Sequence, residues 1–159
     1  MKLLFSLILF SISHSAFAAN SCLDISGKYS LPSNTAEQKT TLIYSQSGCD
    51  WLIITGTHLT RGGVTVLPEG HYTLDGSRPK NCQNGILLTC AAYKVVGQEI
   101  AKVLSDFALA DGGEHGVCEY TTSVLTKDAQ GNLLETIMDA RCEDAYIGKL
   151  KPIVFAKQK

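Results

Sequence analysis

The sequence lacks an excess of charge of either sign. Its 159 residues include 14 Lys and Arg against 15 Asp and Glu, which leaves a formal net charge of −1. A balance this close to neutral offers no electrostatic surface for DNA, RNA or an anionic membrane, so no nucleic-acid partner is expected. Because 45% of the residues are apolar, the chain is not disordered. Its length suits a single compact domain.

The sequence also lacks the motifs of common catalytic and metal sites. It contains no Gly-x-Ser-x-Gly, no His-Glu-x-x-His, no phosphate-binding Gly-rich loop and no Cys-x-x-Cys. The acidic stretch 111–116 could offer carboxylates to calcium, but it lacks regular ligand spacing and is interpreted as a solvated turn. His58, His71 and His115 are interpreted as surface residues. We therefore expect no enzyme activity, no metal and no cofactor.

Long apolar runs are missing except at the N-terminus. A basic start, an apolar run from Leu3 to Ile12 and the small residues of Ala16-Phe17-Ala18 have the layout of a secretory signal. The run is too short to span a bilayer, and no later segment reaches the length of a membrane helix. The sequence thus predicts a signal peptide over 1–18, a single domain over 19–159, and a secreted or periplasmic protein without a transmembrane segment.

Two alternatives at this end of the chain stay open. Cleavage after Ala19 is close to cleavage after Ala18. A lipid anchor on Cys22 is disfavoured, because no bulky aliphatic residue stands three positions before it and five cysteines would remain.

All six cysteines lie after the predicted signal, and an even count in an exported protein indicates disulfides. They are Cys22, Cys49, Cys82, Cys90, Cys118 and Cys142. Cys82 and Cys90 are close enough in sequence to close a small loop, although a tight turn at Asn84-Gly85 would not place them opposite each other. Cys22–Cys49 then follows by elimination.

The third pair, Cys118–Cys142, follows from strand register. Segments 117–126 and 132–141 flank a strong turn signal, Asp128 to Asn132. If the paired residue numbers sum to 260, Cys118 faces Cys142 and Glu119 faces Arg141, while one face is mostly apolar and the other polar. A slip of one residue would break all of these matches. The ring would contribute on the order of 3 kcal/mol.

Short apolar runs separated by Gly, Asn and Asp turns predict an all-β protein. The expected strands are 26–31, 40–46, 50–57, 63–67, 70–75, 86–96, 117–126, 132–141 and 149–156. Connections this short favour an antiparallel up-and-down meander, and roughly eight such strands would close into a barrel. Segment 97–109 has apolar residues at helical spacing and predicts one short helix against the barrel. A strand there would put Lys102 and Asp106 on the same face as Ile100 and Leu104.

The stretch Cys22 to Tyr29, with Gly27-Lys28-Tyr29, resembles the first strand of calycins, the family of lipocalin, avidin and fatty-acid-binding barrels. Tyr29 stands where the family carries Trp. Leu42 to Ile54 and Tyr72 to Gly76 are similar to small bacterial lipocalin-like secreted proteins. The resemblance implies an aromatic across the closed end of the barrel, packed against a basic residue such as Lys149 or Lys151. It implies a cavity for a small apolar molecule and no enzyme activity.

Several side chains are predicted to line such a cavity, or else to fill the core. They are Trp51, Tyr72, Tyr93, Tyr120, Thr122 and Met138, with Val124 and Ala140 on the same predicted face. Avidin-type biotin sites use several Trp, and this chain has one. The function expected is therefore binding of a small apolar or amphipathic ligand. The alternative is a protein-binding module, such as a hydrolase inhibitor or an envelope partner, that works through a loop at 76–85 or 110–117.

Overall fold

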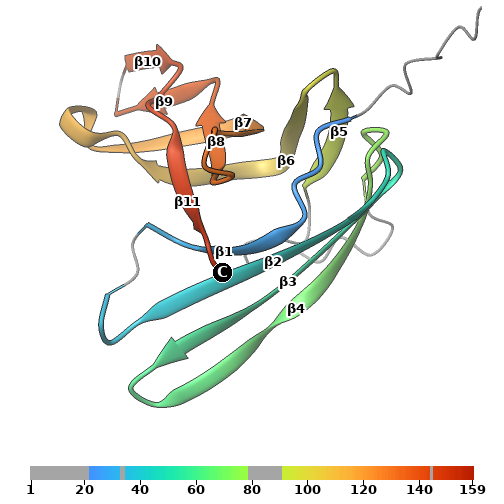
Figure 1. The fold of residues 1–159 in the computed structure, drawn as a ribbon. Coiled ribbons are helices and arrows are strands. Elements are labelled where there is room, and N and C mark those ends of the chain that lie inside the picture. The colour runs from blue at the N-terminus through green and yellow to red at the C-terminus, as the bar shows by residue number, and fades with distance from the viewer. Residues whose placement is uncertain (1–21, 33–34, 79–90, 144) are drawn as a thin grey trace, which may run out of the picture.

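The computed structural model describes residues 22–32, 35–78, 91–143 and 145–159. Four strands form the first half of the sheet: β1 (Gly27–Ser30), β2 (Lys39–Ser47), β3 (Trp51–Thr60) and β4 (Gly63–Thr73). Each is antiparallel to the next. Figure 1 shows them as one curved layer. The predicted signal over 1–18 and the Cys82–Cys90 pair lie outside the described residues.

The second half of the sheet follows in the chain and lies over the first in Figure 1. It comprises β5 (Ala92–Val96), β6 (Glu99–Asp111), β7 (Val117–Lys127), β8 (Leu133–Ile137), β9 (Ala140–Cys142) and β10 (Ala145–Gly148). The last strand, β11 (Ile153–Lys157), pairs with β8 on one side and β1 on the other. It therefore joins the halves into one antiparallel sheet of eleven strands, which confirms the predicted all-β class.

The predicted closed barrel is not present as a continuous ladder in the part of the chain that is described. Where β4 and β5 approach, they share only an isolated bridge between Asp75 and Lys94. Two backbone hydrogen bonds flank it: Gly76 N–H to the Tyr93 carbonyl (2.9 Å) and Val95 N–H to the Leu74 carbonyl (3.1 Å). We call this junction the β4–β5 seam.

The predicted helix over 97–109 is wrong. This segment is strand β6, entered through a turn at Gly97, whose φ of 62° suits glycine. Ile100, Lys102 and Leu104 alternate toward the interior, and the charge of Lys102 is balanced there by Glu135 (2.7 Å). Because Glu135 balances its charge, Lys102 can face the interior from a strand. Within the described ranges, the helical structure is a single 3₁₀ turn, η1 (Gly113–His115).

The predicted register of the 117–141 hairpin is confirmed. Cys118 pairs with Cys142, Glu119 with Arg141 and Val124 with Thr136. The Cys118–Cys142 disulfide forms, and so does Cys22–Cys49. The predicted turn closes where the Asp128 carboxylate accepts N–H groups of Gln130 (2.9 Å) and Asn132 (2.8 Å).

The predicted inward-facing side of that hairpin is correct only near the Cys118–Cys142 disulfide, where Tyr120 and Ala140 are buried. Strand β8 ends at Ile137 and β9 begins at Ala140, with a bend over Met138 and Asp139. The Asp139 carboxylate accepts the Thr121 hydroxyl (2.6 Å) and the Thr122 N–H (2.9 Å). Beyond this bend Ser123 and Leu125 are buried on β7 in place of Thr122 and Val124, and Glu135, Thr136 and Ile137 are all buried on β8. Met138, expected inside, is 40% exposed.

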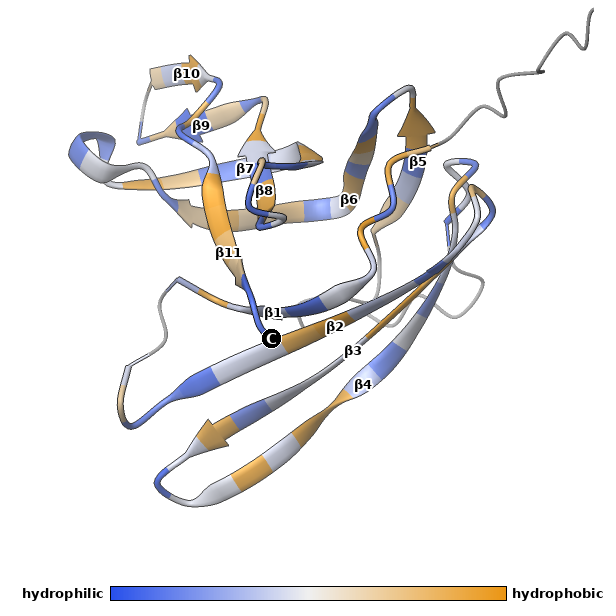
Figure 2. Ribbon diagram, in the orientation of Figure 1, coloured by the Kyte–Doolittle hydropathy of each residue, from blue (hydrophilic) through white to orange (hydrophobic). Residues whose placement is uncertain are grey.

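The core consists of two apolar clusters. The larger gathers side chains from both halves of the sheet, including Tyr29, Leu52, Tyr72 and Tyr93. The smaller surrounds the Cys118–Cys142 disulfide and includes Tyr120, Ile137 and Leu150. Leu104 and Ile153 pack against both clusters. Figure 2 shows apolar segments in both layers and along β11.

The segment from Cys22 to Tyr29 is held in place by several contacts. The Tyr29 side chain is fully buried, donates its hydroxyl to the Ile25 carbonyl (3.1 Å) and meets Tyr44 edge-on at 5.7 Å. Gln46 Nε2 donates to the Leu23 carbonyl (2.8 Å), next to the Cys22–Cys49 disulfide. Lys149 and Lys151, suggested as partners of Tyr29, are exposed and border a pocket instead.

Strand β4 lies at one end of the strand order, so none of the described strands pairs with its edge from Gly63 to Leu67. Its pairing with β3 contains one extra residue on β4, because Ile54 pairs with Gly70 and Gly56 with Leu67. Pro68 and Glu69 occupy this bulge. Val64 and Val66, on the outward face before it, are largely exposed.

Candidate ligand-binding site

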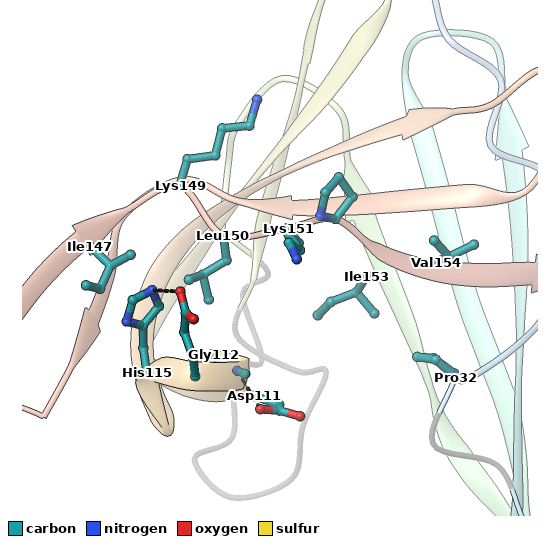
Figure 3. A pocket seen from close by; sticks show the side chains of 13 residues that line it. Pro32, Asp111, Gly112, His115, Ile147, Lys149, Leu150, Lys151, Ile153 and Val154 are labelled. Carbon is teal, nitrogen blue, oxygen red and sulfur yellow. Dashed lines mark hydrogen bonds and ion pairs between the residues drawn. The ribbon is translucent and has the colours of Figure 1, made fainter.

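The candidate site is a pocket where the β6–β7 connection faces the segment joining β10 to β11. Its volume is about 860 Å³. It is lined by Pro32, Asp111, Gly112, Gly113, Glu114, His115, Ile147, Lys149, Leu150, Lys151, Pro152, Ile153 and Val154 (Figure 3).

One wall is the turn at 111–115, predicted as a solvated turn. The Asp111 carboxylate accepts the Gly113 N–H (2.8 Å), and the Gly112 N–H donates to the Gly116 carbonyl (2.8 Å). A Cβ at Gly112 would collide with Cys118 Sγ, so this wall rests directly on the disulfide. The turn is therefore exposed in its side chains but anchored in its backbone.

The floor is apolar and belongs to the core. Leu150 is buried, and its N–H donates to the Ile137 carbonyl (3.0 Å), which fixes the segment between β10 and β11. Ile147 and Ile153 pack against the same clusters. In Figure 3 the side chains of Leu150 and Ile153 lie on either side of Lys151, and Asp111 lies below them in this view. A ligand resting here would cover surface that is already rigid.

Charged groups of opposite sign stand on opposite walls. Asp111 and Glu114 belong to the β6–β7 turn, and Lys149 and Lys151 flank Leu150 across the floor. Glu114 lies 3.6 Å from His115 on its own wall. None of the four ion pairs among the described residues joins the two walls.

A second polar cluster lies inside the sheet. Lys102 Nζ is 2.7 Å from Glu135 Oε1, and the two side chains are only 13% and 7% exposed. The Ser123 hydroxyl donates to the same Glu135 oxygen (2.6 Å). The pair joins β6 to β8 through the intervening strand β7, on which Ser123 lies.

Both members of this pair are held in their charged forms. Burial alone would lower the pKa of Lys102, but the Glu135 carboxylate and nearby tyrosine hydroxyls outweigh it, and the pKa lies above its ordinary value. Burial would raise the pKa of Glu135, yet the ammonium of Lys102 and the Ser123 hydrogen bond lower it overall. The pair is a buried salt bridge, with no free base or nucleophile on either residue.

The predicted ligand-binding residues separate into buried and exposed groups. Tyr72 and Tyr93 are buried together, with ring centroids 4.7 Å apart in an edge-on contact. Tyr120 is buried in the smaller cluster. Burial raises the pKa of all three phenols. These rings fill the core, which is the second of the two roles predicted for them, and do not line a cavity.

The other predicted lining residues do not face the interior. Trp51 is 55% exposed and lies on the outer face of β3, because the residues alternating with it, Leu52 and Ile54, are the buried ones. Met138 faces outward at the bend described above. Thr122 is half-buried beside the Asp139 carboxylate.

The loop over 110–117 was expected to act only in protein binding, and the opposite wall over 147–154 was not expected to form part of a site. Lys149 and Lys151 resemble solubilising charge, and nothing local shows that Leu150 between them is buried. The usable signal is Pro152, which has no N–H for a strand ladder and stands immediately before β11.

The histidines agree in part with their prediction as surface residues. His71 and His115 are exposed, whereas His58 is half-buried, with Nδ1 2.8 Å from the Thr40 hydroxyl. Across the described ranges no three His, Cys, Asp or Glu side chains are grouped to hold a metal ion. No helix among these residues is long and apolar enough to cross a membrane.

Comparisons of the chain with protein-family models, curated proteins and solved structures give no match.

Proposed function

We propose that this protein is an exported, non-enzymatic binding protein that holds a small apolar or amphipathic molecule. The observation that carries the proposal is the pocket with its apolar floor and charged rim. Its volume of about 860 Å³ lies within the range of roughly 300–1,000 Å³ typical of small-molecule sites. Such sites combine an apolar lining with a few polar groups that orient the ligand, and this pocket has both.

The proposed ligand site lies at the margin of the sheet and not in its centre. The interior position expected from the calycin resemblance is occupied by tyrosine rings and the Lys102–Glu135 pair. We propose that the sheet is a calycin-like barrel left incomplete at the β4–β5 seam, supported by the antiparallel order and the bridge at that seam.

Export is supported by the two disulfides. Cys22–Cys49 and Cys118–Cys142 need an oxidising environment to form and persist. We infer a secreted or periplasmic location, in agreement with the predicted signal peptide.

The test is the binding of an environment-sensitive apolar dye to the purified protein. Val154 borders the pocket and is 44% exposed, so Val154→Trp adds bulk there without disturbing the core. We expect this variant to bind the dye at least about fivefold more weakly, since the indole occupies part of the apolar surface. The matched control is Val66→Trp, an exposed strand valine outside the pocket. Equal dye binding by both variants would contradict the proposal.

A second function, a protein-binding module, is favoured by a different observation. The β3–β4 hairpin exposes Leu59, Val64 and Val66 on its outer face, where Leu59 pairs with Val64 and Val66 pairs with Thr57. Exposed apolar patches often mark protein contacts. If this function is correct, Val66→Asp abolishes capture of a protein partner while Val154→Trp leaves it intact. If instead Val154→Trp abolished capture and Val66→Asp left it intact, the pocket would be the site that recognises the partner.

A further inference from the structure

We propose that the ligand of this pocket is a zwitterion whose positive and negative ends are separated by an apolar body. This inference rests on the proposed function and specifies the ligand class. Its basis is the arrangement of an anionic wall and a cationic wall across one apolar floor.

The anionic wall is preorganised to receive a positive group. Asp111 uses Oδ1 to accept the Gly113 N–H, which fixes the carboxylate at the start of the turn and leaves Oδ2 available. Figure 3 shows this carboxylate at the edge of the pocket. Gly112 lies against Cys118 Sγ, so the backbone of this wall cannot shift toward the core without displacing the disulfide.

The cationic wall is fixed by a buried leucine. Lys151 follows Leu150, whose backbone N–H is bonded to Ile137, and precedes Pro152. Figure 3 shows the Lys151 side chain within the pocket, whereas Lys149 extends outward from its rim. Lys151 belongs to none of the ion pairs in the described part of the chain.

The two walls do not neutralise each other, because no ion pair joins them. A singly charged ligand would meet one wall favourably and leave the opposite charge beside its apolar end. A zwitterion with an apolar middle satisfies both walls and covers Leu150 and Ile153, which line the same pocket. Partly exposed ion pairs of this kind each change affinity by about two- to fivefold.

The probe is trileucine in four forms: free at both ends, N-acetylated, C-amidated, and blocked at both ends. Isothermal titration calorimetry at low ionic strength gives the Kd of each. We expect the zwitterion to bind most tightly and each single block to weaken binding by about two- to fivefold. Raising the salt concentration should reduce the difference, since exposed charges are screened.

Two variants assign the ends of the ligand to the walls. Lys151→Gln should weaken only those forms that keep the carboxylate. Asp111→Asn should weaken only those that keep the ammonium, and the Asn carbonyl can still accept the Gly113 N–H. The matched controls are Lys39→Gln and Asp50→Asn, exposed residues outside the pocket, which should change none of the four Kd values.

The same titrations with 8-aminooctanoate distinguish two sources of this chemistry, an ω-amino acid and a short peptide. Tighter binding of either one, with both variant effects retained, supports the proposal and identifies the source. Equal Kd values for all four trileucine forms would overturn the proposal. So would variants that change the Kd of all four forms by the same factor. If neither compound binds while Val154→Trp still reduces dye binding, the zwitterion is wrong and the ligand-binding function stands. If that dye effect is also missing, both are wrong.

Discussion

Glu135 is a carboxylate buried in an apolar sheet, and two neighbours make this possible. Lys102 supplies the opposite charge at 2.7 Å, and Ser123 supplies a hydrogen bond at 2.6 Å to the same oxygen. Replacing a buried ion pair by apolar side chains is often neutral, whereas removing one partner leaves an uncompensated buried charge. The two kinds of substitution therefore have different expected effects.

We expect Glu135→Leu and Lys102→Met each to lower the free energy of unfolding by about 3–5 kcal/mol. The double variant should recover most of that loss, because no unpaired charge remains. Urea unfolding of the four proteins measures the coupling. Lys94→Met, which changes an exposed lysine of β5, is the control and should stay within about 0.5 kcal/mol of the native protein. Additive losses in the double variant would show that the pair is not coupled.

The same pair predicts how stability depends on pH. The pKa of Glu135 is lowered by folding from its ordinary value of 4.5. Its contribution is therefore complete above about that pH and is lost as the pH falls through the lower folded pKa. The pKa of Lys102 is raised from 10.5, so its contribution is complete below that pH and is lost only at higher pH. Urea titrations at pH 7, 5 and 3 should show a larger loss on acidification for the native protein than for the double variant. If the native protein and the double variant lost the same free energy of unfolding on acidification, Glu135 would not be the cause of the pH dependence.

At the scale of elements, the two disulfides among the described residues lie in different halves of the sheet and have nearly the same loop length. The sequence separations are 27 for Cys22–Cys49 and 24 for Cys118–Cys142, so loop closure contributes almost equally, about 3 kcal/mol each. Their surroundings differ, because Cys118 and Cys142 are buried while Cys49 is exposed.

We expect replacing both Cys118 and Cys142 by Ala to destabilise the protein more than the same change at Cys22 and Cys49. The difference measures the packing of the buried sulfurs, and chemical unfolding gives both values. The first variant should also weaken dye binding, since the pocket wall at Gly112 rests on Cys118. Equal losses of stability, with dye binding unchanged in both, would contradict this account.

The hairpin of β7 with β8 and β9 shows what the sequence could predict. Two cysteines, a charge pair and a strong turn all supported one register, and that register is correct. The face assignment failed at Met138 because the Asp139 carboxylate binds two adjacent residues of the facing strand. A local hydrogen bond of this kind changes which side chains point inward without changing the pairing.

Strand β6 shows the opposite limit. Its apolar residues fit helical spacing, and only a partner 33 positions away makes Lys102 acceptable inside. The pocket shares this dependence on distant residues, since its walls come from 111–115 and 147–154. Local pattern predicted β6 as a helix and the 111–116 turn as solvated. Most strands could be predicted because turns and alternation are local, whereas the site could not.

For the molecule as a whole, the β4–β5 seam is the weakest junction between neighbouring strands. It has one isolated bridge, whereas β2 and β3 pair along nine successive residues. Local opening should begin where fewest contacts must break. The two halves remain joined on the other side through β11.

We expect the amides of Gly76 and Val95 to exchange with solvent faster than the ladder amides of β2 and β3, in native-state hydrogen exchange followed by NMR. Both amides donate across the seam. Their exchange should depend weakly on low urea concentrations, as local opening does, while that of the ladder follows global unfolding. Exchange of all these amides at a single rate set by global unfolding would show that the seam does not open separately.

The edge of β4 that none of the described strands covers affects whether molecules of this protein associate at high concentration. Unpaired backbone groups beside Val64 and Val66 are a template onto which another molecule could add a strand, the first step toward a fibre. Pro68 has no N–H to offer, and the extra residue at Pro68–Glu69 bends the edge away from a straight ladder. Growth along β4 would therefore stop after a few residues. The bulge thus limits strand addition at this edge, which opposes aggregation at high protein concentration.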